Sequence, residues 1–337
     1  MIIKTLSYPR AALIGNPSDG YFGKTIAFLF KNFKAEIVLY ESPDLEIIPS
    51  EYDSAIFKSI SNLAGEVGLY GYYGGVRLLK ASIKRFYEYC VDNDIRLAEK
   101  NFTIRYFSNI PFRLGLAGSS AIITACMRAL MKFFNVNIPI PALANLVLSV
   151  ETKELKISAG LQDRVAQAYE TPVLMDFDEK MMKRRGYGNY TEIPAESFPN
   201  LYIAYRRDLS EGSEMVHDNF RERYNIREKA VLEAIEKWKS LTDETYTALL
   251  SKDIKRVGKL MNQNFDVRRS VMKLSDKNLQ MVEVARKTGA SAKFTGSGGA
   301  IIGTYPDYAS LQELKVRLGE IGVDLIIPDI VREKTEN

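Results

Sequence analysis

A glycine-rich segment at residues 111–125, P-F-R-L-G-L-A-G-S-S-A-I-I-T-A, is the feature that most constrains how this chain can fold. It follows an apolar, alternating stretch at 102–107 that is typical of a strand, and it continues into a good helix-forming run. A glycine turn that opens a helix exposes unpaired backbone N–H groups at the positive end of the helix dipole. The segment therefore predicts mixed α and β structure with an anion site, phosphate being the common biological anion. The alternative is a glycine turn packed against a neighbour, with a serine as an ordinary N-cap, and the segment alone does not decide between the two.

The order of the predicted elements indicates two α+β domains, because strands and helices do not alternate regularly. A chain of 337 residues is also too long for one ordinary core. Polar residues, glycines and prolines gather at 180–200, so we predict an N-terminal domain at 1–185 and a C-terminal domain at 186–337. Expected strands cover 11–15, 34–40, 102–107, 172–177, 201–206, 291–295, 300–304 and 324–327; expected helices cover 75–90, 121–134, 141–155 and 308–318, with long charged helices up to 280.

Composition and charge exclude several classes of protein. The 46 basic residues are interspersed with 42 acidic ones, which does not require a nucleic-acid partner and mildly favours anionic substrates. The apolar runs are too short to span a bilayer and the N-terminus lacks a signal-peptide core, so we expect a cytoplasmic protein with no membrane or nucleic-acid partner. Oligomeric state stays open. Cys90 and Cys126 are expected as core thiols, and His217 is the only histidine, which disfavours histidine-based acid–base chemistry.

Two acidic residues are candidates for catalysis. Glu151 ends an apolar helix pattern, so its carboxylate can lie near the core, and Asp163 follows a glycine. Phosphoryl transfer needs charge neutralisation, Mg²⁺ and a positioned nucleophile. One carboxylate on the metal and one beside the substrate hydroxyl would meet that need. The alternative is a pair of solvated acids near helix ends.

Two more segments are candidate binding loops. The segment 10–24, R-A-A-L-I-G-N-P-S-D-G-Y-F-G-K, is favoured as a plain turn from its residues alone. In a binding loop, Asp19 would accept hydrogen bonds from sugar hydroxyls, and Arg10 and Lys24 would offset negative charge. The segment 293–299, K-F-T-G-S-G-G, is favoured as a hairpin connection, although its glycines also permit close approach to a ligand or another loop. Neither matches the Walker pattern, which argues against a P-loop fold.

Together these four segments resemble the GHMP kinase superfamily, which includes galactokinase, homoserine kinase, mevalonate kinase and phosphomevalonate kinase. The resemblance covers essentially the whole chain in order. Residues 111–121 are similar to the second motif of the family, P-x-x-x-G-L-x-x-S-S-A, and 293–299 to the third, a glycine loop that supports the phosphate loop from the other domain. The resemblance implies an α+β, two-domain fold, with an N-terminal domain like domain 2 of ribosomal protein S5, a ferredoxin-like C-terminal domain, and ATP and Mg²⁺ in the cleft between them.

The resemblance also implies roles for individual residues. L-I-G-N-P-S-D is similar to the first motif of the sugar kinases, although Asn16-Pro17 stands where galactokinase has Glu-His, so galactose itself is not indicated. G-L-Q-D at 160–163 is similar to the galactokinase segment that holds the catalytic Asp, and Glu151 stands at the family's spacing for the Mg²⁺ ligand. The implied site has Asp163 and Arg10 as catalytic residues; Gly115, Leu116, Ala117, Gly118, Ser119 and Ser120 around the ATP phosphates; Ser120 and Glu151 on the metal, with Ser119 beside them; and Asp19, Asn16, Lys24, Arg113 and Tyr73 around the substrate.

Three strings narrow the resemblance to the glucuronokinases: G-N-P-S-D-G-Y-F-G-K-T-I, Y-G-Y-Y-G-G-V-R-L-L-K and A-K-F-T-G-S-G-G-A. This implies an ATP-dependent kinase for the anomeric C1 hydroxyl of a sugar acid, D-glucuronate, whose carboxylate would need a cation. Arginine suits that role because its planar fork binds bidentately, and Arg113, Arg164 and Arg206 or Arg207 are candidates. The alternatives are another anomeric GHMP kinase, for a heptose, arabinose or galacturonate, and a non-catalytic GHMP-fold binding or regulatory protein. Retention of both candidate carboxylates argues against the last.

Overall fold

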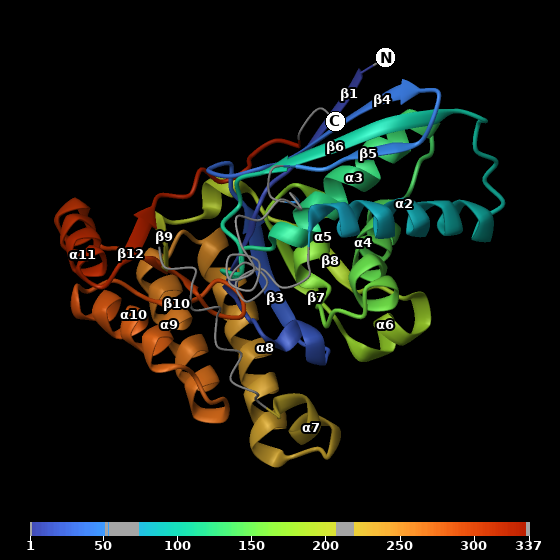
Figure 1. Ribbon diagram of the computed structural model, residues 1–337. Coiled ribbons are helices and arrows are strands. Elements are labelled where there is room, and N and C mark those ends of the chain that lie inside the picture. The colour runs from blue at the N-terminus through green and yellow to red at the C-terminus, as the bar shows by residue number, and fades with distance from the viewer. Residues whose placement is uncertain (1, 51–52, 54–73, 207–218, 335–337) are drawn as a thin grey trace, which may run out of the picture.

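The structure, a computed structural model, describes residues 2–50, 53, 74–206 and 219–334. Within these residues the fold consists of three four-stranded sheets and the helices around them (Figure 1). Strands and helices are mixed along the chain without regular alternation, as the sequence predicts for an α+β protein.

The first sheet is buried on one side and packs against two helices. Exposed and buried side chains alternate along its first strand, which is typical of an antiparallel sheet with one solvated face. Helices α2 (Gly75–Asp92) and α3 (Gly118–Phe134) pack together here, and α2 buries Leu79, Phe86 and Cys90 at helical spacing. In spatial order the strands are β1 (Ile2–Ser7), β4 (Ala35–Ser42), β6 (Asn101–Ser108) and β5 (Glu46–Ile48).

The second sheet packs against helices from both halves of the chain. Its strands β2 and β3 are buried along nearly their whole length, which requires cover on both faces. Helix α5 (Gln162–Tyr169) packs on this sheet from the N-terminal half of the chain, and α8 (Lys229–Leu250) and α9 (Ile254–Val271) pack on it from the C-terminal half. In spatial order the strands are β2 (Arg10–Ile14), β3 (Lys24–Leu29), β7 (Val173–Asp176) and β8 (Asn189–Glu192).

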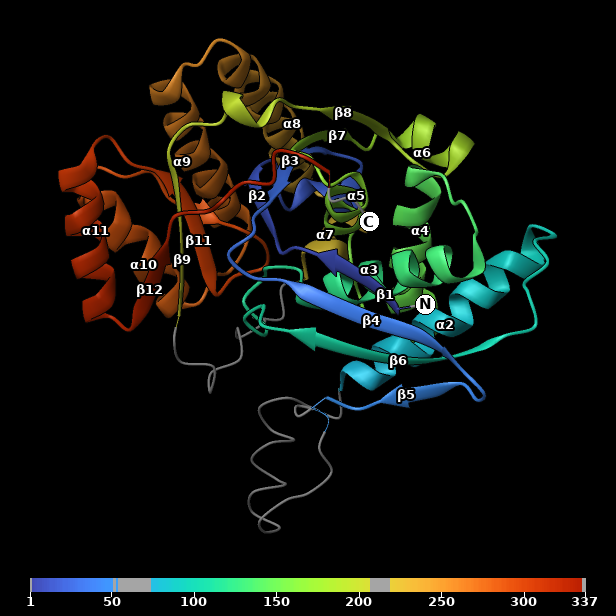
Figure 2. The ribbon, with the colours of Figure 1, turned by 90° about the horizontal axis from the view of Figure 1, so that it is seen from above.

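The third sheet belongs to the C-terminal half and has a core of its own. All its neighbouring strands pair antiparallel, and helices α10 (Asp276–Lys287) and α11 (Tyr308–Glu320) pack against it. Figure 2 shows this sheet and its helices on one side of the molecule, with α2 on the opposite side. In spatial order the strands are β10 (Lys293–Phe294), β11 (Ala300–Thr304), β9 (Leu201–Arg206) and β12 (Val323–Ile326).

The second sheet continues past the predicted domain boundary at 185/186. After helix α6 (Glu179–Arg185), strand β8 pairs with β7 and extends the sheet to Glu192. The polar residues that suggest a linker form an edge strand, and an edge strand tolerates polar side chains because it is open to solvent. A short 3₁₀ helix, η4 (Ala195–Ser197), then leads to β9, so we propose that the two domains join within 193–200.

The C-terminal segment returns to strand β3 of the second sheet. The amide of Val331 donates to the carbonyl of Leu29 at 2.9 Å, and the amide of Lys31 donates to the carbonyl of Asp329 at 2.8 Å. The end of the described chain therefore closes on the N-terminal half, a contact that no local sequence pattern predicts.

The predicted helix at 141–155 divides into two parts, α4 (Ile140–Ser149) and a single π-helical turn, η3 (Val150–Glu154). The predicted strand at 291–295 is shorter than expected, and the other predicted strands and helices are confirmed with small shifts at their ends. Cys90 and Cys126 are buried free thiols, as expected. Among the described helices, none has both the length and the apolar character that crossing a membrane requires.

Candidate active site

The glycine-rich segment forms a loop that leads directly into α3. Gly115 and Ala117 both adopt left-handed backbone, with φ of +65° and +63°, and so turn the chain at the start of the helix. No side chain in the described part of the chain caps α3, so the first N–H groups of the helix remain free for a ligand. This loop is the predicted phosphate loop, and the helix dipole favours an anion there.

A second glycine loop, between β10 and β11, packs against the phosphate loop. The amide of Ala12 donates to the carbonyl of Thr295 at 3.0 Å, which anchors the second loop on β2. A Cβ on Gly296 would lie 2.5 Å from the carbonyl oxygen of Gly115, so only a glycine allows this approach. The loop therefore connects two strands as a hairpin and also packs against the predicted phosphate loop, so both interpretations of this segment apply.

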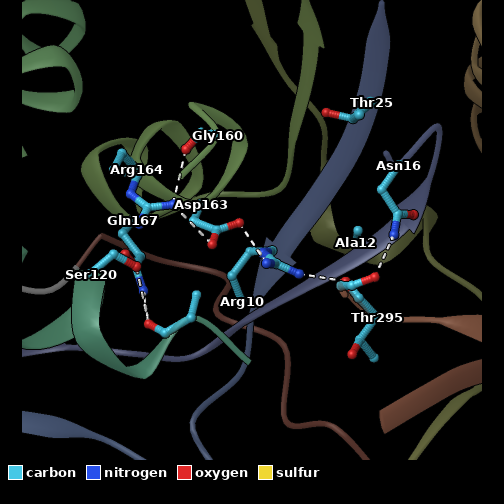
Figure 3. Close-up of polar contacts among 12 residues, drawn as sticks. Arg10, Ala12, Asn16, Thr25, Ser120, Gly160, Asp163, Arg164, Gln167 and Thr295 are labelled. Atoms are coloured by element: carbon cyan, nitrogen blue, oxygen red, sulfur yellow. Dashed lines mark hydrogen bonds and ion pairs between the residues drawn. The ribbon is translucent and has the colours of Figure 1, made fainter. Parts of the chain in front are cut away.

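Arg10, the first residue of β2, lies where the two loops meet (Figure 3). Its amide donates to the carbonyl of Leu116 at 3.0 Å, and its guanidinium donates to the carbonyl of Thr295. Its Nη2 atom lies 2.5 Å from Oδ1 of Asp163. Only 4% of Arg10 is exposed, so this ion pair lies in a poorly solvated position where its charges act strongly.

Helix α5 joins Asp163, the candidate catalytic carboxylate, to the predicted phosphate loop. Asp163, in its first turn, faces Arg10. One turn later, Gln167 donates to the carbonyls of Ala117 at 3.0 Å and Tyr8 at 3.1 Å. Residues four apart lie on the same face of a helix, so one short helix fixes both the acid and the loop (Figure 3).

Arg164 lies between the two candidate carboxylates. Its Nε donates to Oε2 of Glu151 at 3.0 Å, and its Nη1 donates to Oδ2 of Asp163 at 3.1 Å and to the carbonyl of Gly160 at 2.9 Å. Arg164 and Glu151 are both almost fully buried. The structure therefore removes Arg164 from the predicted candidates for binding a substrate carboxylate, because its donors are used within the protein.

The π-helical turn η3 brings Glu151 to the start of α3. Oε1 of Glu151 accepts a hydrogen bond from the hydroxyl of Ser119 at 2.7 Å. Ser120, the residue predicted on the metal, is fully buried, and its hydroxyl donates to the carbonyl of Ala117 at 3.1 Å. Consecutive helix residues point roughly 100° apart, so only one of the two serines reaches Glu151, and that one is Ser119.

Asp19 lies in the 3₁₀ helix η1 (Ser18–Tyr21), against the turn that precedes α5. A Cβ on Gly160 would lie 2.5 Å from Oδ2 of Asp19. Burial, followed by the charge of Asp163, raises the pKa of Asp19 to about 6. Burial also acts to raise the pKa of Asp163, but its two arginine neighbours outweigh it and hold that pKa below the ordinary value. A firmly ionised carboxylate and a readily protonated one thus lie close together.

Two of the predicted substrate residues have partners within the protein. Asn16 is buried, and its amide donates to the carbonyl of Phe294, at the end of β10, at 3.3 Å and to that of Gly296, in the second glycine loop, at 3.4 Å. Nζ of Lys24 lies 3.3 Å from Asp176 and 3.0 Å from Asp243. Asn16 therefore ties the first loop to the third motif, and the charge of Lys24 is already balanced.

Of the remaining predicted residues, the structure describes Arg113 and Arg206. Arg113 is exposed, and its guanidinium lies 5.2 Å from the ring centroid of Phe112. Arg206 ends β9, and its Nε and Nη1 atoms are buried without a hydrogen-bond partner among the described residues. Tyr73 and Arg207 lie outside the described residues.

Two buried polar residues at this site, Gln167 and Lys293, were not predicted from the sequence. The one available signal for Gln167 is its position one helical turn after Asp163. Lys293 is 1% exposed, and its amine donates to the carbonyls of Ala12 at 2.8 Å and Phe294 at 2.7 Å. Burial, reinforced by two nearby arginines, lowers the pKa of Lys293 well below its usual value, and its amine joins β10 to β2.

Comparison with known proteins agrees with this geometry. The sequence matches the N-terminal domain of the GHMP kinases over residues 77–171 and their C-terminal domain over residues 245–324. It is 42% identical over 318 residues to glucuronokinase 1 of Arabidopsis thaliana, covering 93% of this chain and 87% of that protein. It is 44% identical to probable glucuronokinase 2 of the same plant, covering 91% of this chain and 86% of that one.

Solved structures share the fold at low sequence identity. Galactokinase from Lactococcus lactis, complexed with galactose, aligns with a TM-score of 0.78 at 14% identity, covering 100% of this chain and 95% of that one. Phosphomevalonate kinase from Streptococcus pneumoniae aligns with a TM-score of 0.73 at 14% identity, covering 98% and 100%. With its two-domain α+β fold, its matched domains and its relatives over nine tenths of its length, the chain belongs to the GHMP kinases.

Proposed function

We propose that this chain transfers the γ-phosphoryl group of ATP to the anomeric C1 hydroxyl of D-glucuronate and releases D-glucuronate 1-phosphate and ADP. The choice of reaction is supported by membership of the GHMP kinases. The choice of sugar is supported by identities of 42% and 44% to the two Arabidopsis proteins, each over nine tenths of this chain.

The observation that carries this proposal is the ion pair between Arg10 and Asp163, which lies between the phosphate loop and Asp19. A phosphate at the start of α3 and a sugar at Asp19 would meet at this pair. Phosphoryl transfer depends mainly on positioning and on charge stabilisation, and an arginine beside a carboxylate supplies both.

Each residue of the pair has a distinct part in the reaction. Asp163 is ionised and accepts a hydrogen bond from the anomeric hydroxyl, which aligns its oxygen for attack and can take its proton. Arg10 stabilises the negative charge that develops on the phosphoryl oxygens. The bond between the γ-phosphorus and the bridging oxygen breaks as the bond from the anomeric oxygen forms, so ADP leaves with the negative charge.

We propose Mg²⁺ as the metal, held by Glu151 and Ser119. Oε2 of Glu151 is used by Arg164, while Oε1 faces the exposed Ser119, and these oxygens suit Mg²⁺. The described residues contain no cluster of three or more metal-ligating side chains. Two protein ligands are nevertheless sufficient, because Mg²⁺ commonly completes its shell with phosphate oxygens and water. Bound there, the metal would neutralise phosphate charge.

A substrate panel tests the proposal. The purified protein is incubated with ATP, Mg²⁺ and either D-glucuronate, D-galacturonate, L-arabinose, a heptose or D-glucose; ADP release gives kcat/KM and phosphorus NMR locates the phosphate. We expect the highest kcat/KM with D-glucuronate and an anomeric phosphate in the product. Asp163→Ala should abolish turnover while ATP binding persists. A clear preference for a neutral sugar would refute the assignment to a sugar acid.

A further inference from the structure

One arginine outside the site described so far lies beside the loop that carries Asp19. Arg221 belongs to the short helix α7 (Phe220–Asn225). Its guanidinium carbon lies 5.1 Å from the centroid of the Tyr21 ring, and its Nη2 atom lies 3.5 Å from the position that a Cβ on Gly20 would occupy. Arg221 therefore contacts the two residues that directly follow Asp19.

Aromatic packing holds α7 in this place. The ring centroid of Tyr21 lies 5.0 Å from that of Phe220 and 5.0 Å from that of Tyr224, both in edge-to-face contact. Phe220 is 2% exposed and also packs on Trp238 of α8. Such contacts contribute more than the apolar area they bury, so the position of Arg221 over the loop is built into the fold.

Among the described residues, no acidic side chain pairs with Arg221. The other cations close to Asp19 and Asp163 are committed: Arg10 and Arg164 bind carboxylates of the site, and Lys24 pairs with two aspartates. Arg221 is exposed and has no acidic partner in the part of the chain that the structure describes. A guanidinium stacked on a ring keeps its edge N–H groups free, and these groups match a carboxylate bidentately.

We infer that Arg221 binds the carboxylate of the sugar acid and thereby selects an acid over a neutral sugar. The inference rests on the proposed function, which places the anomeric hydroxyl at Asp163 and other hydroxyls at Asp19. Along the bound sugar, Asp163 would then contact the reacting end and Arg221 the far end, with Asp19 and Gly20 between them. Arg113 lies against Phe112 within the glycine-rich segment and Arg164 is buried between Glu151 and Asp163, so neither contacts the residues that follow Asp19.

The test compares a charged substrate with its neutral isostere. Kinetics are measured for Arg221→Gln and Arg221→Lys with D-glucuronate and with D-glucuronamide, in which an amide replaces the carboxylate. Arg317→Gln is the control, because Arg317 is an exposed arginine on α11 that pairs with Glu313. Thermal unfolding of each variant establishes that it is folded.

We expect Arg221→Gln to raise KM for D-glucuronate by about 10- to 100-fold, with kcat nearly unchanged, because a charge-assisted bidentate contact to the substrate is lost. KM for D-glucuronamide should stay at its wild-type value. KM of Arg221→Lys for D-glucuronate should lie between the values of the wild type and of Arg221→Gln, since an ammonium group keeps the charge without the planar fork of the guanidinium. Arg317→Gln should behave as wild type.

The outcomes separate this inference from the proposed function. If the wild type uses D-glucuronate and Arg221→Gln keeps its KM, or if Arg113→Gln raises KM instead, the role of Arg221 is overturned and the proposed function stands. If the wild type phosphorylates only neutral sugars, the proposed function fails and the inference fails with it. If Arg221→Gln raised KM equally for D-glucuronate and D-glucuronamide, the substitution would have disturbed the whole loop that carries Asp19, and this result would also overturn the role of Arg221.

Discussion

The contact between Gly160 and Asp19 gives a sharp test of the site. Gly160 precedes α5, and a Cβ there would lie 2.5 Å from Oδ2 of Asp19, whereas ordinary contacts begin at 3.4 Å. The substitution Gly160→Ala therefore requires the carboxylate to retreat by roughly 1 Å, which is enough to disturb a positioned substrate. Gly160 does not adopt left-handed backbone, so alanine fits its main chain without strain.

We expect Gly160→Ala to lower kcat/KM for the sugar and to leave the stability of the fold nearly unchanged. Losing a well-placed hydrogen bond to a charged group costs about 1.5–3 kcal/mol, so kcat/KM for the sugar should fall by about 10- to 100-fold. Stability should change little, because the displaced atom ends a flexible side chain and replacing glycine at a compatible site can itself stabilise by about 0.4–1 kcal/mol. KM for ATP should stay unchanged.

A coupled assay for ADP at saturating ATP, with the sugar varied, measures the first effect, and thermal unfolding measures the second. Gly319→Ala is the matched control: Gly319 lies in α11, and a Cβ there would meet nothing within 4 Å. Asp19→Ala and the double variant that combines it with Gly160→Ala complete a double-mutant cycle. If the loss acts through Asp19, Gly160→Ala should add almost nothing in the Asp19→Ala background. The reasoning would be refuted if Gly160→Ala kept the wild-type kcat/KM. It would also be refuted if Gly160→Ala lowered kcat/KM by the same factor in the wild-type and Asp19→Ala backgrounds.

Two further predictions concern charge. Arg164→Met should lower the free energy of unfolding by about 3–5 kcal/mol, because it leaves Glu151 buried and unpaired; urea unfolding measures this, and Glu151→Gln in the same chain should restore part of the loss. The pKa of about 6 for Asp19 predicts that kcat/KM for the sugar declines as the pH falls through 6, because a protonated carboxyl group accepts fewer hydrogen bonds. Asp163 has a lowered pKa and stays ionised over this range. A pH profile measures this limb, and an identical limb in Asp19→Asn would contradict the assignment.

Local chemistry explains why much of the site is predictable from the sequence. The phosphate loop depends on glycine backbone and on the start of one helix, and both are encoded within a few residues. The strand that begins at Arg10 is likewise visible as a local apolar pattern, whereas the short helix that carries Asp163 was not among the predicted helices. Their roles came from a resemblance of motifs at family spacing, and the structure brings Arg10 and Asp163 to 2.5 Å of each other.

The sequence by itself indicated the α+β class, the glycine-rich turn that opens a helix and the two candidate carboxylates, because these depend on short-range backbone and side-chain preferences. Only the tertiary structure decided which partner each charge takes: Arg164 with Glu151, Ser119 and not Ser120 beside that carboxylate, and Lys24 with two aspartates. It also decided that α7 docks on the loop of Asp19 and that the C-terminal segment closes on β3. The physical reason is that a buried charge or an aromatic cluster takes the partners that packing brings to it, and packing joins residues far apart in the chain.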